Sequence, residues 1–273
     1  MPELPEVETV ANGVHERTHG QTIQSVWTSN KPQTFKSSPD QIVAALTGSR
    51  IDRVHRVGKT IVVDLSRNGQ AVQFLVHLGM TGRLLVSTPE IPAPSHTHAI
   101  LTLSSGKELR FVDARRFGRL SVLASPTPEE RYAGPGAEPL TVSLEEFIAL
   151  FRRRKTPIKA ALLNQSLLHG VGNIYADESL FHAGIRPTRQ AGRLTRAELT
   201  RLRAALIKVL REAIQLGGSS VSDYVDADGV AGFFQLRHHA YSRTGKPCLV
   251  CGTPIKRIVI GGRSTHFCPE CQK

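Results

Sequence analysis

Four cysteines near the C-terminus form the pattern with the most specific chemistry. Cys248 and Cys251 make one C-x2-C pair, and Cys268 and Cys271 make a second. Each C-x2-C turn presents two thiolates to one ion, and two such turns complete the tetrahedron that Zn²⁺ prefers. Reduced surface thiols or two disulfides are the alternatives, but a disulfide scaffold would spread its cysteines through the chain. The spacing therefore predicts one zinc ion, which is structural because four protein ligands leave no open position.

The amino terminus is the second candidate for chemistry. Met1 is followed by Pro2, a small residue that permits removal of the methionine, and the mature chain would then begin with a secondary amine. An α-amino group has a pKa of about 7.7–8.0, so a usable fraction is neutral near pH 7 and can attack a sugar aldehyde carbon to form an iminium. Glu3 lies beside it and could move protons. The alternative is that Pro2 merely opens a helix, where proline is well tolerated.

Basic residues are concentrated in the second half of the chain. The formal net charge is +12. Residues 1–140 contain 15 Lys and Arg against 13 Asp and Glu, whereas residues 141–273 contain 20 against 10. Such an excess favours a polyanionic partner, most simply nucleic acid, although a basic protein kept soluble by its charge is the alternative.

Glycines and an arginine in this basic half could contact phosphate groups. Gly170 and Gly172 interrupt a helical pattern, and Asn173 lies where the next helix would begin. Amide groups at a helix N-terminus favour a phosphate. Arg263 lies between the two cysteine pairs, where a rigid hairpin could present it to phosphate. The alternative is that each of these residues only faces solvent, but the adjacent zinc ribbon favours contact with DNA.

The elements that must position these residues fall into two classes. Apolar residues at helical spacing predict a helix over 2–16, and short β-like runs separated by turns follow between 20 and 125. Short strands at this spacing indicate an antiparallel sandwich or barrel. The stretch 126–141 is rich in Pro, Gly and Glu and predicts a junction between domains. Capping-box patterns at Ser143 and Thr195 then predict helices.

We therefore predict an α+β multidomain protein, with a catalytic β-sandwich domain over 1–130, a linker over 131–141, a helical domain over 142–240 and a zinc finger over 241–273. No apolar run reaches the length of about 18–20 residues that a membrane span needs. The first residues also lack the features of a secretory signal. We expect a cytoplasmic monomer with no membrane partner.

Four segments occur in the same order as in one known family. They are MPELPEVETV at 1–10, DARRFGRL at 113–120, GVGNIYADESLF at 170–181 and GGRSTHFCPECQK at 261–273. Together they resemble the bacterial formamidopyrimidine-DNA glycosylases over nearly the full chain. The resemblance implies an N-terminal β-sandwich flanked by helices and a C-terminal helix–two-turns–helix domain with a zinc-ribbon hairpin. It also implies that damaged double-stranded DNA is bound and that an 8-oxoguanine or ring-opened purine is flipped out of the duplex.

The same resemblance assigns roles to individual residues. Pro2 would attack C1′ of the damaged nucleotide with Glu3 as acid or base, and the strand would then be cut by β- and δ-elimination. Lys59 matches the position assigned to β-elimination, and Arg263 the one assigned to δ-elimination. Glu6 is expected close to the active site. The remaining matches concern DNA: Met80, Arg115 and Phe117 would fill the gap left by the flipped nucleotide, and His96, Arg115, Arg154, Lys159 and Asn173 would contact DNA.

Two alternatives remain beside the purine-lesion enzyme. One is an enzyme of the same fold that acts on oxidised pyrimidines, and the other is a non-catalytic DNA-binding protein built on a zinc ribbon. The segment 217–234 is acidic and rich in glycine, which suggests a lesion-sensing loop, but Ser222 stands where some relatives have lysine. Recognition of the damaged base is therefore left open.

Overall fold

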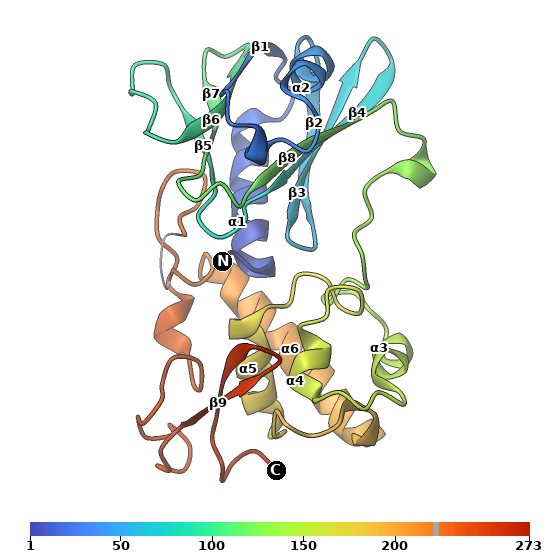
Figure 1. Cartoon of the computed structure of the whole chain (residues 1–273), viewed down its shortest axis with the longest axis vertical. Coiled ribbons are helices and arrows are strands. Elements are labelled where there is room, and N and C mark those ends of the chain that lie inside the picture. The colour runs from blue at the N-terminus through green and yellow to red at the C-terminus, as the bar shows by residue number, and fades with distance from the viewer. Residues whose placement is uncertain (221–223) are drawn as a thin grey trace. The chain divides into compact units, whose positions relative to one another are not determined.

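The computed structural model describes residues 1–220 and 224–273 and divides into two compact units (Figure 1). The first unit comprises residues 1–133 and 217–233, and the second comprises residues 134–216 and 234–273. The prediction had placed 217–233 in the helical domain 142–240, whereas in the structure this segment belongs to the first unit. Ser222, which was singled out in the sequence, lies outside the described residues.

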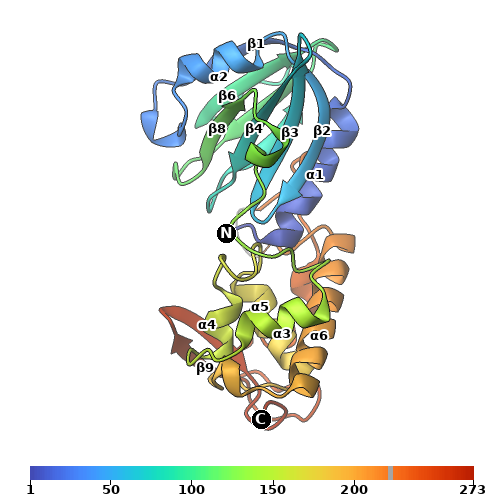
Figure 2. The same ribbon diagram turned by 90° about the vertical axis from the view of Figure 1, so that its right-hand side faces the viewer.

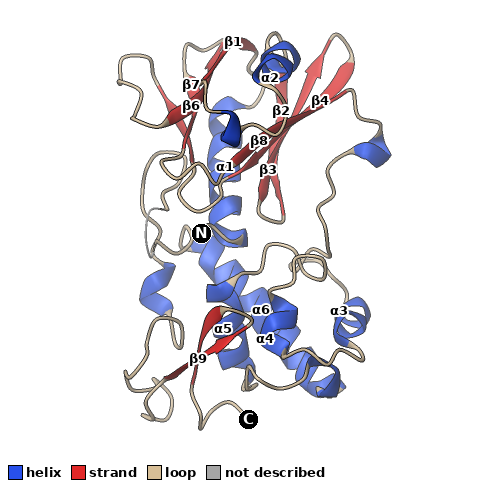
Figure 3. Ribbon diagram, viewed as in Figure 1, coloured by secondary structure: helices blue, strands red, loops and turns tan. Residues whose placement is uncertain are grey.

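Two antiparallel four-stranded sheets form the framework of the first unit, as Figures 2 and 3 show. One sheet has the order β1-β6-β7-β5 and the other β2-β3-β4-β8. The strands are β1 (Ile23–Thr28), β2 (Arg50–Val57), β3 (Thr60–Arg67), β4 (Gln70–His77), β5 (Arg83–Ser87), β6 (Thr97–Leu103), β7 (Glu108–Val112) and β8 (Arg119–Ala124). Buried side chains from both sheets and from the helices form one core.

Helix α1 (Leu4–Thr18) contacts β2 and β3 of one sheet and β5 of the other. Val7, Val10 and Val14 recur at the spacing of one helical face and are buried in the core, which explains why the helix packs there. Helix α2 (Pro39–Leu46) contacts β1 and β8 and begins with a Ser38 cap. Short 3-10 turns, η1 (Pro32–Thr34) and η2 (Pro128–Glu130), complete the unit.

Helices dominate the second unit. They are α3 (Leu144–Phe151), α4 (Ile158–Leu162), α5 (Asn173–Ala183) and α6 (Arg196–Gln215), with 3-10 turns η3 (Ala191–Arg193) and η4 (Phe234–Arg237). Both predicted capping boxes are confirmed, because Ser143 caps α3 and Thr195 caps α6 by accepting a hydrogen bond from the backbone N–H three residues on. Helix α6 packs on α3 and α5.

A two-stranded hairpin, β9 (Lys256–Ile260) and β10 (Arg263–Phe267), contacts α5 through β10. A small core of Phe181, Ala240, Ile255 and two cysteines joins this hairpin region to α5. The fold class is thus confirmed: an antiparallel β-sandwich flanked by helices, and a helical unit that carries a hairpin. Among the described residues, no helix is both long enough and apolar enough to cross a membrane.

Candidate active site and metal centre

The carboxylate of Glu6 organises the start of the chain. It is 1% exposed; one oxygen accepts a backbone hydrogen bond from Glu3 N at 2.8 Å and the other accepts one from Ser219 N at 2.7 Å. Glu6 therefore ties the peptide next to Pro2 to the segment after Gly217. Both partners are amide donors in a buried setting, so each bond to the ionised carboxylate is a strong one.

Gly218 shows how closely this segment approaches Glu6. It has φ +80°, and a Cβ added there would lie 2.9 Å from Glu6 Oε1. Tyr224 closes the same region, because its hydroxyl donates to the Glu6 carbonyl at 3.3 Å. Burial, with the charge of Glu6, raises the pKa of Tyr224, so this phenol stays protonated as a donor.

Pro2 and Glu3 are both buried beside this carboxylate, and Met1 is 48% exposed. In the chain as encoded, the Pro2 nitrogen is part of a peptide bond and cannot act as a nucleophile. Removal of the exposed Met1 would convert it into a secondary amine next to two carboxylic side chains. Such surroundings suit an amine that must attack and then exchange protons.

Lys59 lies in the turn between β2 and β3, directly after Gly58, which has φ +62°. The side chain is half-buried. Burial lowers the pKa of His77, and the positive charge of Lys59 lowers it further. His77 Nδ1 accepts a hydrogen bond from Gly79 N at 3.1 Å, as the neutral imidazole can. His77 is therefore neutral near pH 7 and adds no second positive charge beside the lysine.

Met80, Phe117 and Arg115 are brought to one surface of the first unit. Met80 is 39% exposed and Phe117 49%. The guanidinium of Arg115 lies over the Phe117 ring, 4.9 Å from its centre. A Cβ on Gly79 would come within 2.5 Å of the Phe117 backbone, so the two loops touch directly.

Asp113 holds these loops together, and the sequence reasoning did not single it out. Its buried carboxylate accepts hydrogen bonds from Thr81 Oγ1 at 2.6 Å, Gly118 N at 2.7 Å and Arg115 N at 3.3 Å. Its own N–H donates to the carbonyl of His96, an exposed residue with φ +66°. The four predicted DNA-contacting residues of this unit thus lie around one aspartate. The sequence signal that could have identified Asp113 is its position as the first residue of the DARRFGRL segment.

In the second unit, the position of Lys159 corrects one prediction. We expected it to contact DNA phosphate, but its side chain is 0% exposed and its ammonium pairs with the equally buried Asp177. The other oxygen of Asp177 accepts hydrogen bonds from His266 N at 2.9 Å and His266 Nδ1 at 3.0 Å. The lysine is buried because the hairpin packs over it, so it supports the hairpin instead of contacting a ligand directly.

Asn173 begins α5 and Arg263 begins β10, the two elements that the hydrogen bonds between Asp177 and His266 join. Asn173 is the first residue of α5 and its amide donates to Ser264 Oγ at 3.4 Å. Arg263, the first residue of β10, is exposed and follows Gly261 and Gly262, both with positive φ. Arg154 is also exposed, but it lies after α3, and its Nε donates to the Leu150 carbonyl.

The four cysteines gather as the spacing predicted. Their sulfur atoms all lie within 4.8 Å of one another, with 3.4 Å between the sulfurs of Cys251 and Cys268 and 3.9 Å between those of Cys248 and Cys271. A tetrahedral zinc with bonds of about 2.3 Å needs sulfurs roughly 3.8 Å apart. None of the four forms a disulfide.

Backbone amides point at these sulfurs. Val250 N donates to Cys248 Sγ and Cys271 N to Cys268 Sγ, both at 3.4 Å. Such bonds stabilise thiolates, the form that binds metal. The side-chain hydrogen bond with Thr253 lowers the pKa of Cys251 to about 6, whereas burial raises the pKa of Cys268 and of Cys271. The donor set therefore fits one structural zinc, which would hold the loops at the base of the β9–β10 hairpin.

Comparison with known proteins covers nearly the whole chain. Three family models match: formamidopyrimidine-DNA glycosylase N-terminal domain over residues 1–120, formamidopyrimidine-DNA glycosylase H2TH domain over residues 134–225, and zinc finger found in FPG and IleRS over residues 245–273. A formamidopyrimidine-DNA glycosylase from Solibacter usitatus is 46% identical over 273 residues, covering all of both chains. One from Thioalkalivibrio sulfidiphilus is 42% identical, also over the full length of both.

Solved structures agree with the sequence comparison. The MutM (FPG) protein of Thermus thermophilus is 42% identical, with a TM-score of 0.86 over 99% of this chain and 98% of that one. Wild-type Lactococcus lactis Fpg in complex with DNA containing N7-benzyl-Fapy-dG is 32% identical, with a TM-score of 0.89 over all of both chains.

Proposed function

The chain belongs to the formamidopyrimidine-DNA glycosylase family, and we propose that it removes oxidised purines from duplex DNA with the free amine of Pro2 as nucleophile. Base excision and cleavage of the resulting abasic site are the activities of this family, and damaged DNA is the partner. The observation that carries the residue assignment is the double hydrogen bond of Glu6, which fixes the peptide beside Pro2 against the 217–220 segment.

The chemistry begins when the neutral Pro2 amine donates its electron pair to C1′ of the damaged nucleotide. The bond from C1′ to the base breaks, and the base leaves with the electron pair and takes up the proton that the Pro2 nitrogen loses after its attack. Opening of the sugar ring breaks the C1′–O4′ bond, O4′ takes a proton from the Glu3 carboxyl, and an iminium links C1′ to the enzyme. The position of Glu3, which directly follows Pro2 and is 4% exposed, supports this role.

Strand cleavage follows from the iminium, which acidifies the C2′ proton. Loss of that proton expels the 3′ phosphate in β-elimination, and a second elimination expels the 5′ phosphate. We assign Lys59 to proton transfer in the first step and Arg263 to the second. The exposed guanidinium of Arg263 on a glycine-flanked turn suits a phosphate leaving group, since arginine can bind it with two hydrogen bonds.

DNA binding would use the exposed residues of each unit. Met80 and Phe117 are exposed apolar residues on two touching loops, and they can enter the base stack and offset part of the cost of unstacking. Arg115 and His96 are exposed beside them. The corresponding candidates in the second unit are Arg154, which is exposed, and Asn173, which is half-buried. The proposal includes action as a monomer on cytoplasmic DNA.

Trapping with borohydride tests the nucleophile. A duplex with 8-oxoguanine opposite cytosine is incubated with the mature protein and borohydride, which reduces the iminium to a stable covalent complex. We expect trapping by the mature protein and none by a protein whose N-terminal extension keeps the Pro2 nitrogen in a peptide bond. The matched control carries the same extension at the C-terminus. Equal trapping by the two extended proteins would refute the assignment to Pro2.

The same assay on a second duplex addresses lesion class. With an oxidised pyrimidine in place of 8-oxoguanine, we expect slower single-turnover excision. Faster excision of the pyrimidine would favour the alternative substrate class while leaving the nucleophile assignment intact.

A further inference from the structure

A second group of metal-ligating side chains lies in the helical unit, apart from the four cysteines. We propose that Glu178, His182 and His239 form a binding site for a divalent transition-metal ion, with one carboxylate oxygen and two imidazole nitrogens as ligands. One ligand atom from each residue lies within 4.8 Å of the others. None of the three belongs to the catalytic or DNA-contacting set.

Helix α5 places the first two ligands. Glu178 and His182 are four residues apart, so both side chains lie on the same face one turn apart. His239 comes from the segment that follows η4 (Phe234–Arg237). Its ring centre is 4.6 Å from that of His182, and its Nδ1 is 3.8 Å from Glu178 Oε2. Metal bonds of about 2.1 Å in a tetrahedron need ligand atoms roughly 3.4 Å apart, so small rotations of the side chains would suffice.

Backbone hydrogen bonds hold the carboxylate and His239 in place. Glu178 accepts from His239 N at 2.9 Å, Ala240 N at 2.9 Å and Tyr241 N at 2.8 Å. The carboxylate is therefore oriented, and the 239–241 segment is fixed to α5, before any ion arrives. A site whose ligands are already positioned loses little entropy on binding.

The imidazoles are available as ligands. His239 Nδ1 is buried and has no hydrogen-bond partner among the described residues, and an unsatisfied buried nitrogen is costly. Binding a metal would satisfy it. His182 is exposed, which gives an ion access from solvent.

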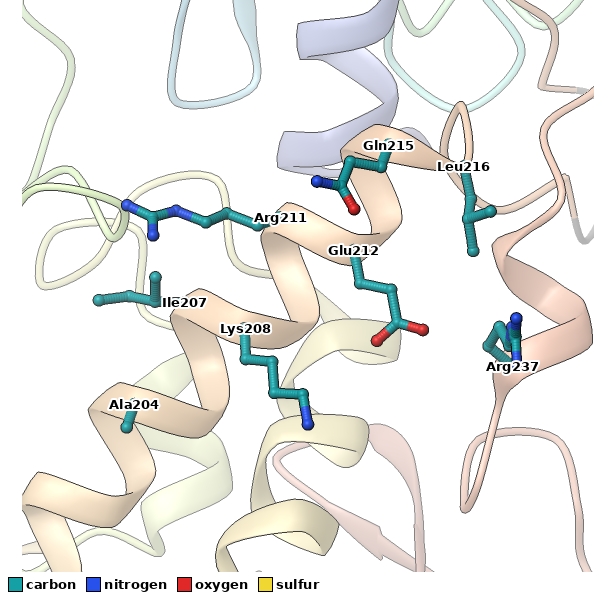
Figure 4. Close-up of a pocket in the computed structure, with 8 residues that line it drawn as sticks. All are labelled: Ala204, Ile207, Lys208, Arg211, Glu212, Gln215, Leu216 and Arg237. Atoms are coloured by element: carbon teal, nitrogen blue, oxygen red, sulfur yellow. The ribbon is translucent and has the colours of Figure 1, made fainter.

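Charges on α6 face the same region. The positive charge of Lys208 disfavours a cation at His182, whereas the negative charge of Glu212 favours one. Both residues also line the surface pocket in Figure 4, together with Arg211, Gln215, Arg237 and three apolar residues. The proposed ion would therefore lie near this pocket.

The ligand types indicate which ions fit. Two imidazoles and one carboxylate suit Zn²⁺, Ni²⁺, Co²⁺ or Cu²⁺ and not Ca²⁺ or Mg²⁺, which take oxygen ligands. Three protein ligands leave a position for water, unlike the closed cysteine site. An ion bound here would connect α5 to the 239–241 segment, so it should stabilise the folded helical unit.

Metal stoichiometry tests the proposal. Tag-free protein with one zinc in its cysteine site is dialysed against Ni²⁺, and both metals are counted by mass spectrometry. We expect one zinc and one nickel per wild-type chain, and one zinc without nickel in His182→Ala and His239→Ala. The matched control is His19→Ala, because His19 is exposed and also stacks on a histidine four residues away, but it lies in the other unit.

Thermal unfolding gives a second readout. Nickel should raise the Tm of the wild type and of His19→Ala but leave that of His182→Ala unchanged. The retained zinc of each variant shows that its helical unit is folded. Wild-type protein that binds no nickel, or His182→Ala and His239→Ala proteins that bind as much as the wild type, would overturn the proposal.

Discussion

Replacement of Glu6 by glutamine isolates the contact on which the proposed active site depends. One oxygen of the carboxylate accepts an amide hydrogen bond from Glu3 N, and the other accepts one from Ser219 N. Glutamine has nearly the same shape but only one oxygen, so one buried amide would face an NH₂ group. Leaving a buried donor unsatisfied costs about 1–3 kcal/mol. The variant must therefore lose either the position of the peptide beside Pro2 or that of the 217–220 segment.

That cost converts into a measurable rate. If the contact is required in the reacting complex, about 1–3 kcal/mol corresponds to a decrease of roughly 5- to 150-fold in the single-turnover rate of 8-oxoguanine excision. The rate is followed with enzyme in excess over a labelled duplex, so that product release does not contribute. Glu16→Gln is the matched control, because Glu16 lies on the same helix with a 73% exposed side chain.

Three measurements separate local from global effects. Zinc content and Tm report on folding, and the Kd for a duplex containing an uncleavable abasic analogue reports on DNA binding. We expect zinc content and the Kd to stay near wild-type values in Glu6→Gln, and the Tm to fall by roughly 2–4 °C per kcal/mol. The main loss is in excision. An excision rate within twofold of the wild type would refute the reasoning that this carboxylate positions the nucleophile.

Two further predictions concern the helical unit. Asp177→Asn removes the charge that faces the buried Lys159 ammonium, and breaking a buried pair in this way costs about 3–5 kcal/mol. Release of zinc to a coloured chelator should therefore begin at a lower urea concentration than in the wild type. An unchanged midpoint of zinc release would contradict the pairing. The Cys268→Ser protein should lose both zinc and DNA affinity, because the loops around the ion need the ion in order to fold. Full DNA affinity in the metal-free protein would show that the hairpin does not contribute to binding.

Local features of the fold could be predicted from the sequence because their causes are local. The capping boxes at Ser143 and Thr195 are formed by side chains three residues apart, and the structure contains both. The C-x2-C pairs bend the chain around their own sulfurs, so their gathering also follows from spacing. The family itself was identified from four short segments, and the comparisons confirm it.

The sequence alone determined the zinc centre, the element types and the family, because each depends on residues close together in the chain or on an ordered set of motifs. Only the tertiary structure decided which residues from distant segments meet. It placed Lys159 under the hairpin instead of on the surface. It also placed the Asp113 carboxylate where it accepts hydrogen bonds from both the Met80 loop and the Phe117 loop. It also brought His239 to Glu178, a contact that no spacing predicts because packing between elements, and not the local chain, sets the burial and neighbours of a side chain.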